Sequence, residues 1–159
     1  MPFAFFGLAL VAVSAVDLER QIIPNRLVYP TLAALVVLLV MASAVDDRWH
    51  ALATAAISGA VAFAAFFAIH LIVPRGMGFG DVRLAGVIGL ATGWLGYGQV
   101  VVGFIAAFFL GALIGVVAMA VTDAGRKTRI PFGPFLAAGA VVTVLWGGPV
   151  AHTLFHRTT

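Results

Sequence analysis

The chain is organised around the stretch Gly76-Met77-Gly78-Phe79-Gly80-Asp81, where an apolar run meets a short polar segment. Three glycines in five positions give a backbone that can take positive φ angles and that leaves room for another chain to come close. Asp81 stands at the start of the next apolar run, and Asp17 occupies a similar boundary earlier in the chain. An ionisable group at the edge of a hydrocarbon layer is costly and indicates a functional site. We therefore expect Asp17 to be the partner of Asp81.

The composition predicts an integral membrane protein of the all-α class. Of 159 residues, 63% are hydrophobic and 9% are charged, against about 25% charged residues in soluble domains. The mean hydropathy is +1.14. The sequence has no cysteine, which excludes disulfides, thiolate zinc sites and a cysteine nucleophile. Its four histidines are scattered, so we expect neither a metal site nor a cofactor.

The lengths of the apolar runs predict a compact bundle of six transmembrane helices. A bilayer core of about 30 Å needs about 20 helical residues. The longest charge-free run, 84–122, would measure about 58 Å as one helix, so we expect it to fold back at Gly96-Tyr97-Gly98. The chain is predicted to form one membrane-embedded domain, 1–159, with helices of which the first and fourth are short, near residues 2–17, 27–45, 50–73, 82–95, 99–121 and 132–154.

Basic residues in the connections predict the orientation of the bundle. Two of them, Arg48 and Arg157, lie on one side of the predicted membrane. Seven lie on the other side: Arg20, Arg26, Arg75, Arg83, Arg126, Lys127 and Arg129. The positive-inside rule then places both termini outside and both Asp17 and Asp81 at the cytoplasmic face.

The same basic residues also bear on the partners of the protein. A net charge of +3 is spread over short loops without a dense basic patch, so we expect no nucleic-acid partner. We assign Arg83, Arg126, Lys127 and Arg129 to orientation and to contact with anionic membrane lipid.

Small residues at helical spacing predict where the helices pack closely. One series lies on the third predicted helix, at Ala56, Ala60, Ala64 and Ala68. Another lies on the fifth, at Gly103, Ala107, Gly111 and Gly115.

Each aspartate also has a purely structural interpretation. Asp81 could be a helix N-cap, because Asp before an apolar run satisfies unpaired backbone N–H groups. Asp17 could be an interfacial charge beside Glu19 and Arg20. Taken together, however, two carboxylates can share a proton and activate water, one accepting a proton from the water and the other donating to a carbonyl.

The segments around the two aspartates suit this chemistry. Gly78 and Gly80 would let an extended substrate backbone approach. Pro24 and Asn25 would end the first loop in a fixed turn.

Three ordered segments resemble the type IV prepilin peptidases, membrane aspartic peptidases of the Gly-x-Gly-Asp type. The first runs from Asp17 to Asn25 and contains Ile23-Pro24-Asn25. The second runs from Gly76 to Leu84, with Arg83 where the family often has Lys. The third is Ile130-Pro131-Phe132-Gly133-Pro134-Phe135-Leu136. The resemblance implies that Asp17 and Asp81 are catalytic and that Gly78, Gly80, Pro24 and Asn25 form the active-site loops.

The resemblance also implies a substrate and a location. The enzyme would remove the short basic leader of prepilins or pseudopilins at the cytoplasmic face of the bacterial inner membrane. Larger relatives carry a cysteine zinc cluster and an N-methyltransferase region. The chain therefore looks like the minimal, peptidase-only form of tight-adherence pilus systems, although it could also be an excised portion of a longer protein.

A rival hypothesis is a small six-helix transporter or channel subunit in which Asp17 and Asp81 bind a cation or relay protons. It accounts for intramembrane acids equally well. It does not account for the glycine-rich approach to Asp81 or for the third segment.

Overall fold

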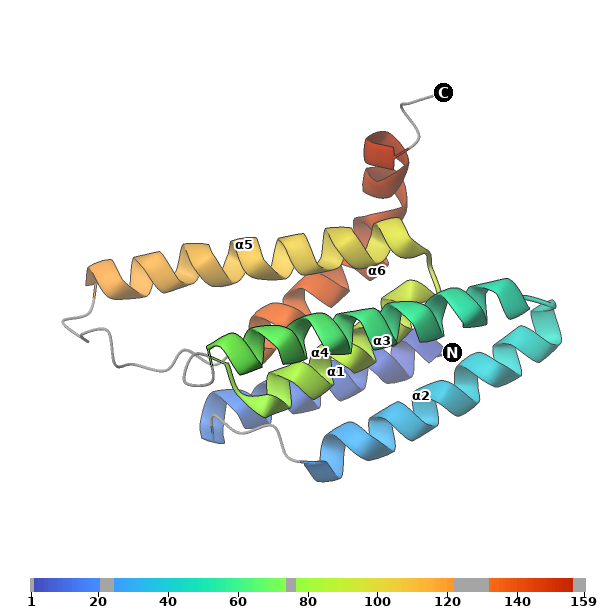
Figure 1. The fold of residues 1–159 in the computed structure, drawn as a ribbon, viewed down its shortest axis with the longest axis horizontal. Coiled ribbons are helices and arrows are strands. Elements are labelled where there is room, and N and C mark those ends of the chain that lie inside the picture. Colours follow the sequence, from blue (N-terminus) through green and yellow to red (C-terminus); the bar gives the residue numbers. More distant parts are fainter. Residues whose placement is uncertain (1, 21–24, 74–76, 122–131, 156–159) are drawn as a thin grey trace.

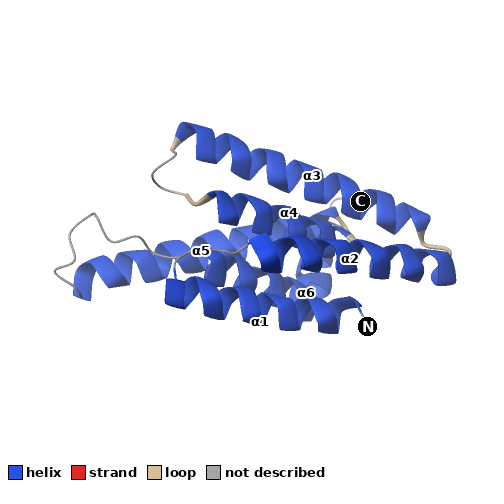
Figure 2. Ribbon diagram, turned by 90° about the horizontal axis from the view of Figure 1, so that it is seen from below, coloured by secondary structure: helices blue, strands red, loops and turns tan. Residues whose placement is uncertain are grey.

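The computed structural model describes residues 2–20, 25–73, 77–121 and 132–155, and within them the chain forms helices and no strand. The prediction of an all-α bundle of six helices is confirmed, and each predicted helix end lies within about three residues of the observed one. The helices, shown in Figures 1 and 2, are α1 (Pro2–Arg20), α2 (Asn25–Asp46), α3 (Trp49–Ile72), α4 (Phe79–Gly93), α5 (Tyr97–Val121) and α6 (Gly133–Phe155).

Successive helices alternate in direction, so the same end of the bundle collects the ends of α1, α3 and α5 and the starts of α4 and α6 (Figure 1). We call this the aspartate end, because Asp17 lies in the last turns of α1 and Asp81 in the first turn of α4. Two antiparallel helices can thus bring together residues that are far apart in the sequence.

The lengths of the helices fit a membrane protein. Three described helical segments are long and apolar enough to cross a membrane: Arg26–Asp46, Trp49–Ile72 and Tyr97–Val117. Two shorter apolar segments are Phe3–Asp17 and Gly133–Leu145. α4 has 15 residues, as the short fourth helix predicted. α1 has 19 residues and continues past Asp17 to Arg20, because Leu, Glu and Arg favour the helix and prolong it beyond the apolar run.

The fold-back of the long apolar run is confirmed, but its turn lies slightly earlier than predicted. α5 already begins at Tyr97, and the connection from α4 runs over 94–96. Gly96 has a φ of +132°, a conformation that L side chains rarely adopt. Glycine is therefore required at this one position for its backbone freedom.

α4 lies at the centre of the bundle, and most of its side chains are buried. It packs closely on α3 through small residues. A Cβ atom added to Gly89 would come within 2.7 Å of the Ala62 Cβ, and one added to Gly86 within 3.3 Å of the Phe63 Cβ. The backbones of α3 and α4 therefore approach closely, as expected where helices pack in lipid by van der Waals contact.

The predicted small-residue series is correct on α5 and wrong on α3. Gly103, Ala107 and Gly115 of α5 are buried, and Gly103 lies against Gly139 of α6. On α3, Ala56, Ala60, Ala64 and Ala68 are all exposed. The buried face of α3 is formed instead by Ala55, Ser58, Gly59, Ala62 and Phe66. α3 is apolar on every side, so hydropathy alone does not indicate which face packs against the protein.

Candidate active site

Both aspartates are buried at the aspartate end of the bundle. The side chain of Asp17 is 4% exposed and that of Asp81 is 8% exposed. The charge of Asp17 bears on Asp81 electrostatically. The two residues thus share one end of the bundle, while their pairing as a dyad and the catalytic role assigned to them stay predictions.

The sequence of α1 explains why Asp17 points inward. Phe6, Leu10 and Val13 are almost fully buried and recur at intervals of three or four residues, and Asp17 continues the same stripe. Phe6, Leu10 and Val13 also line a small cavity together with Leu84 of α4. The apolar stripe thus turns one face of α1 into the bundle, and Asp17 at the end of this stripe points inward as well.

A backbone amide at the start of α6 holds the carboxylate of Asp17. The N–H of Gly133 donates to Oδ2 of Asp17 over 3.1 Å. Gly133 is the first residue of α6, and the N-terminus of a helix favours a negative charge through its dipole and its unpaired N–H groups. This bond joins two of the three segments that carry the family resemblance, the one that begins at Asp17 and the one that contains Gly133.

A backbone amide also holds Asp81, and its geometry corrects the N-cap interpretation. Gly78 is the N-cap of α4 and Asp81 is the third residue inside the helix. The N–H of Gly78 donates to Oδ2 of Asp81 over 3.2 Å, and the N–H of Asp81 donates to the carbonyl of Gly78 over 3.1 Å. Asp81 thus takes the acidic position of a capping box, where the side chain reaches back to the N-cap amide.

What matters about the glycines near Asp81 is that they lack a side chain, since their backbone conformation is one that other residues also adopt. Gly78 has φ −70° and ψ 145°, which other residues also adopt. A Cβ atom added to Gly78 would lie 3.3 Å from Oδ2 of Asp81, closer than most real Cβ contacts. Gly80 lies within the first turn of α4. The absence of a side chain at Gly78 therefore gives the carboxylate its room.

The loop before α4 is attached to the end of α3. Nδ1 of His70 lies 2.9 Å from the carbonyl oxygen of Met77, and because a carbonyl only accepts, the ring nitrogen is the donor. The rings of His70 and Phe67 also contact the ring of Phe79, with centroid distances of 5.6 Å and 6.1 Å. α3 thereby fixes the residues on both sides of Gly78.

The remaining site predictions fall partly outside the described residues. Pro24, Ile130 and Pro131 lie outside them, and Asn25 is described only as the first residue of α2. Among the described side chains, no group of three or more His, Asp or Glu could hold a metal ion. Metal-free chemistry stays a prediction.

Gly133 and His70 were not among the predicted site residues. The sequence did single out Gly133 as part of the third segment that resembles the family. Nothing in the sequence, however, indicated that its amide would bind Asp17. His70 gave no signal beyond its position at the end of an apolar run.

A family profile and individual relatives both match this chain, and they point to the same family. The sequence profile described as "Type IV leader peptidase family" matches residues 4–118, which include both aspartates and end before the third segment. A prepilin leader peptidase/N-methyltransferase of Burkholderia pseudomallei (strain 1026b) is 37% identical over 159 residues, covering 92% of this chain and 47% of its own length. No solved structure gives a significant match.

Relatives with the same printed name occur in other bacteria. The protein of Pseudomonas aeruginosa is 30% identical over 148 residues, covering 91% of this chain and 49% of the relative. That of Bacillus subtilis (strain 168) is 31% identical over 153 residues, covering 94% and 57%. The chain thus spans about half the length of the curated relatives it matches, and a profile of one family covers most of its helices. The chain belongs to the Type IV leader peptidase family.

Proposed function

We propose that the chain is an aspartic endopeptidase that removes the short basic leader from prepilins or pseudopilins. The observation that carries this proposal is the burial of Asp17 and Asp81 within electrostatic range of each other at one end of a membrane bundle. Membership of the leader peptidase family supports the reaction class and the type of substrate. The rival hypothesis of a transporter or channel subunit is set aside, because the matched profile and relatives are peptidases.

In the proposed mechanism the two carboxylates share a proton and activate one water molecule. Like charges close together cannot both ionise freely, so one carboxyl group stays protonated while the other is a carboxylate. The carboxylate takes a proton from the water as it attacks the scissile carbonyl, and the protonated partner donates to the carbonyl oxygen. The peptide C–N bond then breaks, and the leaving amine receives a proton from the dyad.

Backbone amides support this role by fixing the carboxyl groups. The Gly133 N–H holds one oxygen of Asp17, and the Gly78 N–H holds one oxygen of Asp81. A positioned pair loses less entropy on reaching the reactive geometry than two freely rotating side chains. Gly78 is exposed, and it offers a place without a side chain where an extended substrate backbone can come close to Asp81.

We further propose that the aspartate end faces the cytoplasm. The seven-to-two division of basic residues between the two sides of the bundle supports this orientation. Within it, the substrate's leader lies in the cytoplasm and its apolar helix lies in the bilayer, so the peptide bond between them reaches the membrane surface beside Asp17 and Asp81. The location is the bacterial inner membrane.

Co-expression with a prepilin tests the function. The substrate should have a basic leader that ends in glycine immediately before an apolar helix, and the expected result is a shift to the size of the leaderless protein. A matched substrate with a bulky residue in place of that glycine should not be processed. Absence of any shift with the first substrate, when both membrane proteins are present in the membrane fraction, would contradict the proposal.

A further inference from the structure

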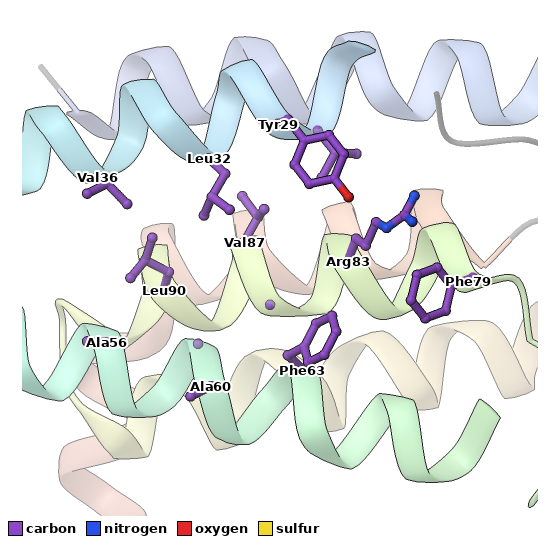
Figure 3. Close-up of a pocket in the computed structure, with 13 residues that line it drawn as sticks. Tyr29, Leu32, Val36, Ala56, Ala60, Phe63, Phe79, Arg83, Val87 and Leu90 are labelled. Carbon is purple, nitrogen blue, oxygen red and sulfur yellow. The ribbon is translucent and has the colours of Figure 1, made fainter. Parts of the chain in front are cut away.

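A groove of about 740 Å³ runs along the bundle between α2, α3 and α4 (Figure 3), and neither Asp17 nor Asp81 is among its lining residues. Most of its lining is apolar and comes from all three helices, as with Leu32 of α2, Phe63 of α3 and Val87 of α4. Ala56 and Ala60, the exposed alanines of α3, form part of its wall. The proposed peptidase chemistry does not use this groove.

The polar groups of the groove gather at its aspartate end. Figure 3 shows Arg83, Tyr29 and Phe79 at one end of the groove and Val36, Ala56 and Leu90 at the other. The guanidinium carbon of Arg83 lies 4.4 Å from the centre of the Phe79 ring and 5.5 Å from that of Tyr29. Phe79 precedes Arg83 by one turn, so the Arg83 side chain extends back toward the start of α4 and the membrane surface. Tyr is likewise favoured at the level of the lipid headgroups.

The length of the groove matches one leaflet of a bilayer. From Phe79 to Leu90 the helix rises about 16 Å, and half of a hydrocarbon core of about 30 Å is about 15 Å. A transmembrane helix would need a groove along the whole core. A phospholipid instead has a charged headgroup at the surface and chains that end at the middle of the bilayer, so this groove fits a lipid better than a helix.

The charge of Arg83 selects the headgroup. The rings of Phe79 and Tyr29 lie beside the guanidinium group and leave its positive charge in place. A phosphate would add to the contacts that Arg83 already makes, because the planar guanidinium group suits phosphate recognition. We propose that the groove between α2, α3 and α4 binds one anionic phospholipid of the leaflet at the aspartate end, with its phosphate on Arg83 and an acyl chain along Leu32, Phe63 and Val87.

Native mass spectrometry of the purified full chain tests this site. Detergent-solubilised protein is offered phosphatidylglycerol or phosphatidylcholine with identical acyl chains. The wild type should retain one phosphatidylglycerol in preference to phosphatidylcholine. Arg83→Gln should lower this preference about fivefold, the change expected for one basic residue at an anionic headgroup, whereas Arg83→Lys should keep most of it.

Arg48 provides a matched control, because its guanidinium carbon lies 5.2 Å from the centre of the Trp94 ring at the opposite end of the bundle. Arg48→Gln should leave the preference unchanged. Ala60→Phe should fill the groove and abolish retention of both lipids, with helical content unchanged by circular dichroism.

Three results would overturn the proposal. The first is an undiminished preference in Arg83→Gln. The second is full displacement of the lipid by inorganic phosphate, which would indicate an anion site without an acyl-chain groove. The third is an Ala60→Phe variant that retains lipid but no longer cleaves a prepilin, which would assign the groove to the substrate helix.

Discussion

Replacement of His70 tests whether α3 holds the loop before Asp81 in its working position. The ring donates to the Met77 carbonyl over 2.9 Å and contacts Phe79 at a centroid distance of 5.6 Å. A neutral hydrogen bond contributes about 1 kcal/mol net, and an aromatic pair contributes about 1 kcal/mol more. His70→Phe removes the donor and keeps a ring, so leader cleavage should fall by up to about fivefold. His70→Ala removes both, and the fall should reach up to about thirtyfold.

The assay is the kcat/KM of leader cleavage by purified enzyme, measured from the appearance of the shortened substrate. His50→Ala is the matched control, because His50 is an exposed histidine on the first turn of the same helix, at the opposite end. It should retain the wild-type rate. The reasoning is refuted if His70→Phe cleaves as fast as the wild type, or if His50→Ala and His70→Ala are equally impaired.

Three further predictions concern topology, metal independence and packing. Single cysteines should resist a membrane-impermeant thiol reagent in intact cells at Gln21, Gly76 and Thr128, and one at Asp47 should react; the reverse pattern would invert the proposed orientation. Cleavage should persist in a strong chelator, and activity that is lost and then restored by zinc would contradict a dyad mechanism. Gly89→Ala should lower the free energy of unfolding by about 1–3 kcal/mol through overpacking against Ala62. Gly7→Ala is the control and should be close to neutral, because nothing lies within 4 Å of the added atom. Thermal unfolding in detergent compares the two variants, and equal midpoints would contradict the close packing of α3 on α4.

The sequence was sufficient for the helices and for the placement of both aspartates at one end of the bundle. The number of helices follows from the thickness of the bilayer and from the lengths of the apolar runs, which can be read directly from the sequence. The placement of Asp17 and Asp81 at the same end follows from the alternation of the helices, because α1 ends where α4 begins. The buried stripe Phe6, Leu10 and Val13 then explains why Asp17 points into the bundle.

Other features depend on tertiary packing that hydropathy does not encode. The exposed Ala56 and Ala60 and the buried Ala55 and Ala62 have the same side chain, so their order could not be read from composition. The bond from Gly133 to Asp17 joins residues distant in the sequence, and the bond from His70 to Met77 depends on how α3 ends. The division into one domain stays a prediction.

The central claim is that Asp17 and Asp81 act as one catalytic unit, and the most direct measurement is leader cleavage by Asp17→Asn, Asp81→Asn and the double variant. Each single variant should lose nearly all activity, and the double variant should be little worse than either, because effects within a catalytic unit are not additive. Asn keeps an oxygen that can accept the amide bonds of Gly133 and Gly78, so both variants should fold and insert. Glu19→Gln, an exposed acid on the same helix as Asp17, should cleave normally. A properly inserted Asp17→Asn or Asp81→Asn variant that processes its prepilin at close to the wild-type rate would show the claim to be wrong.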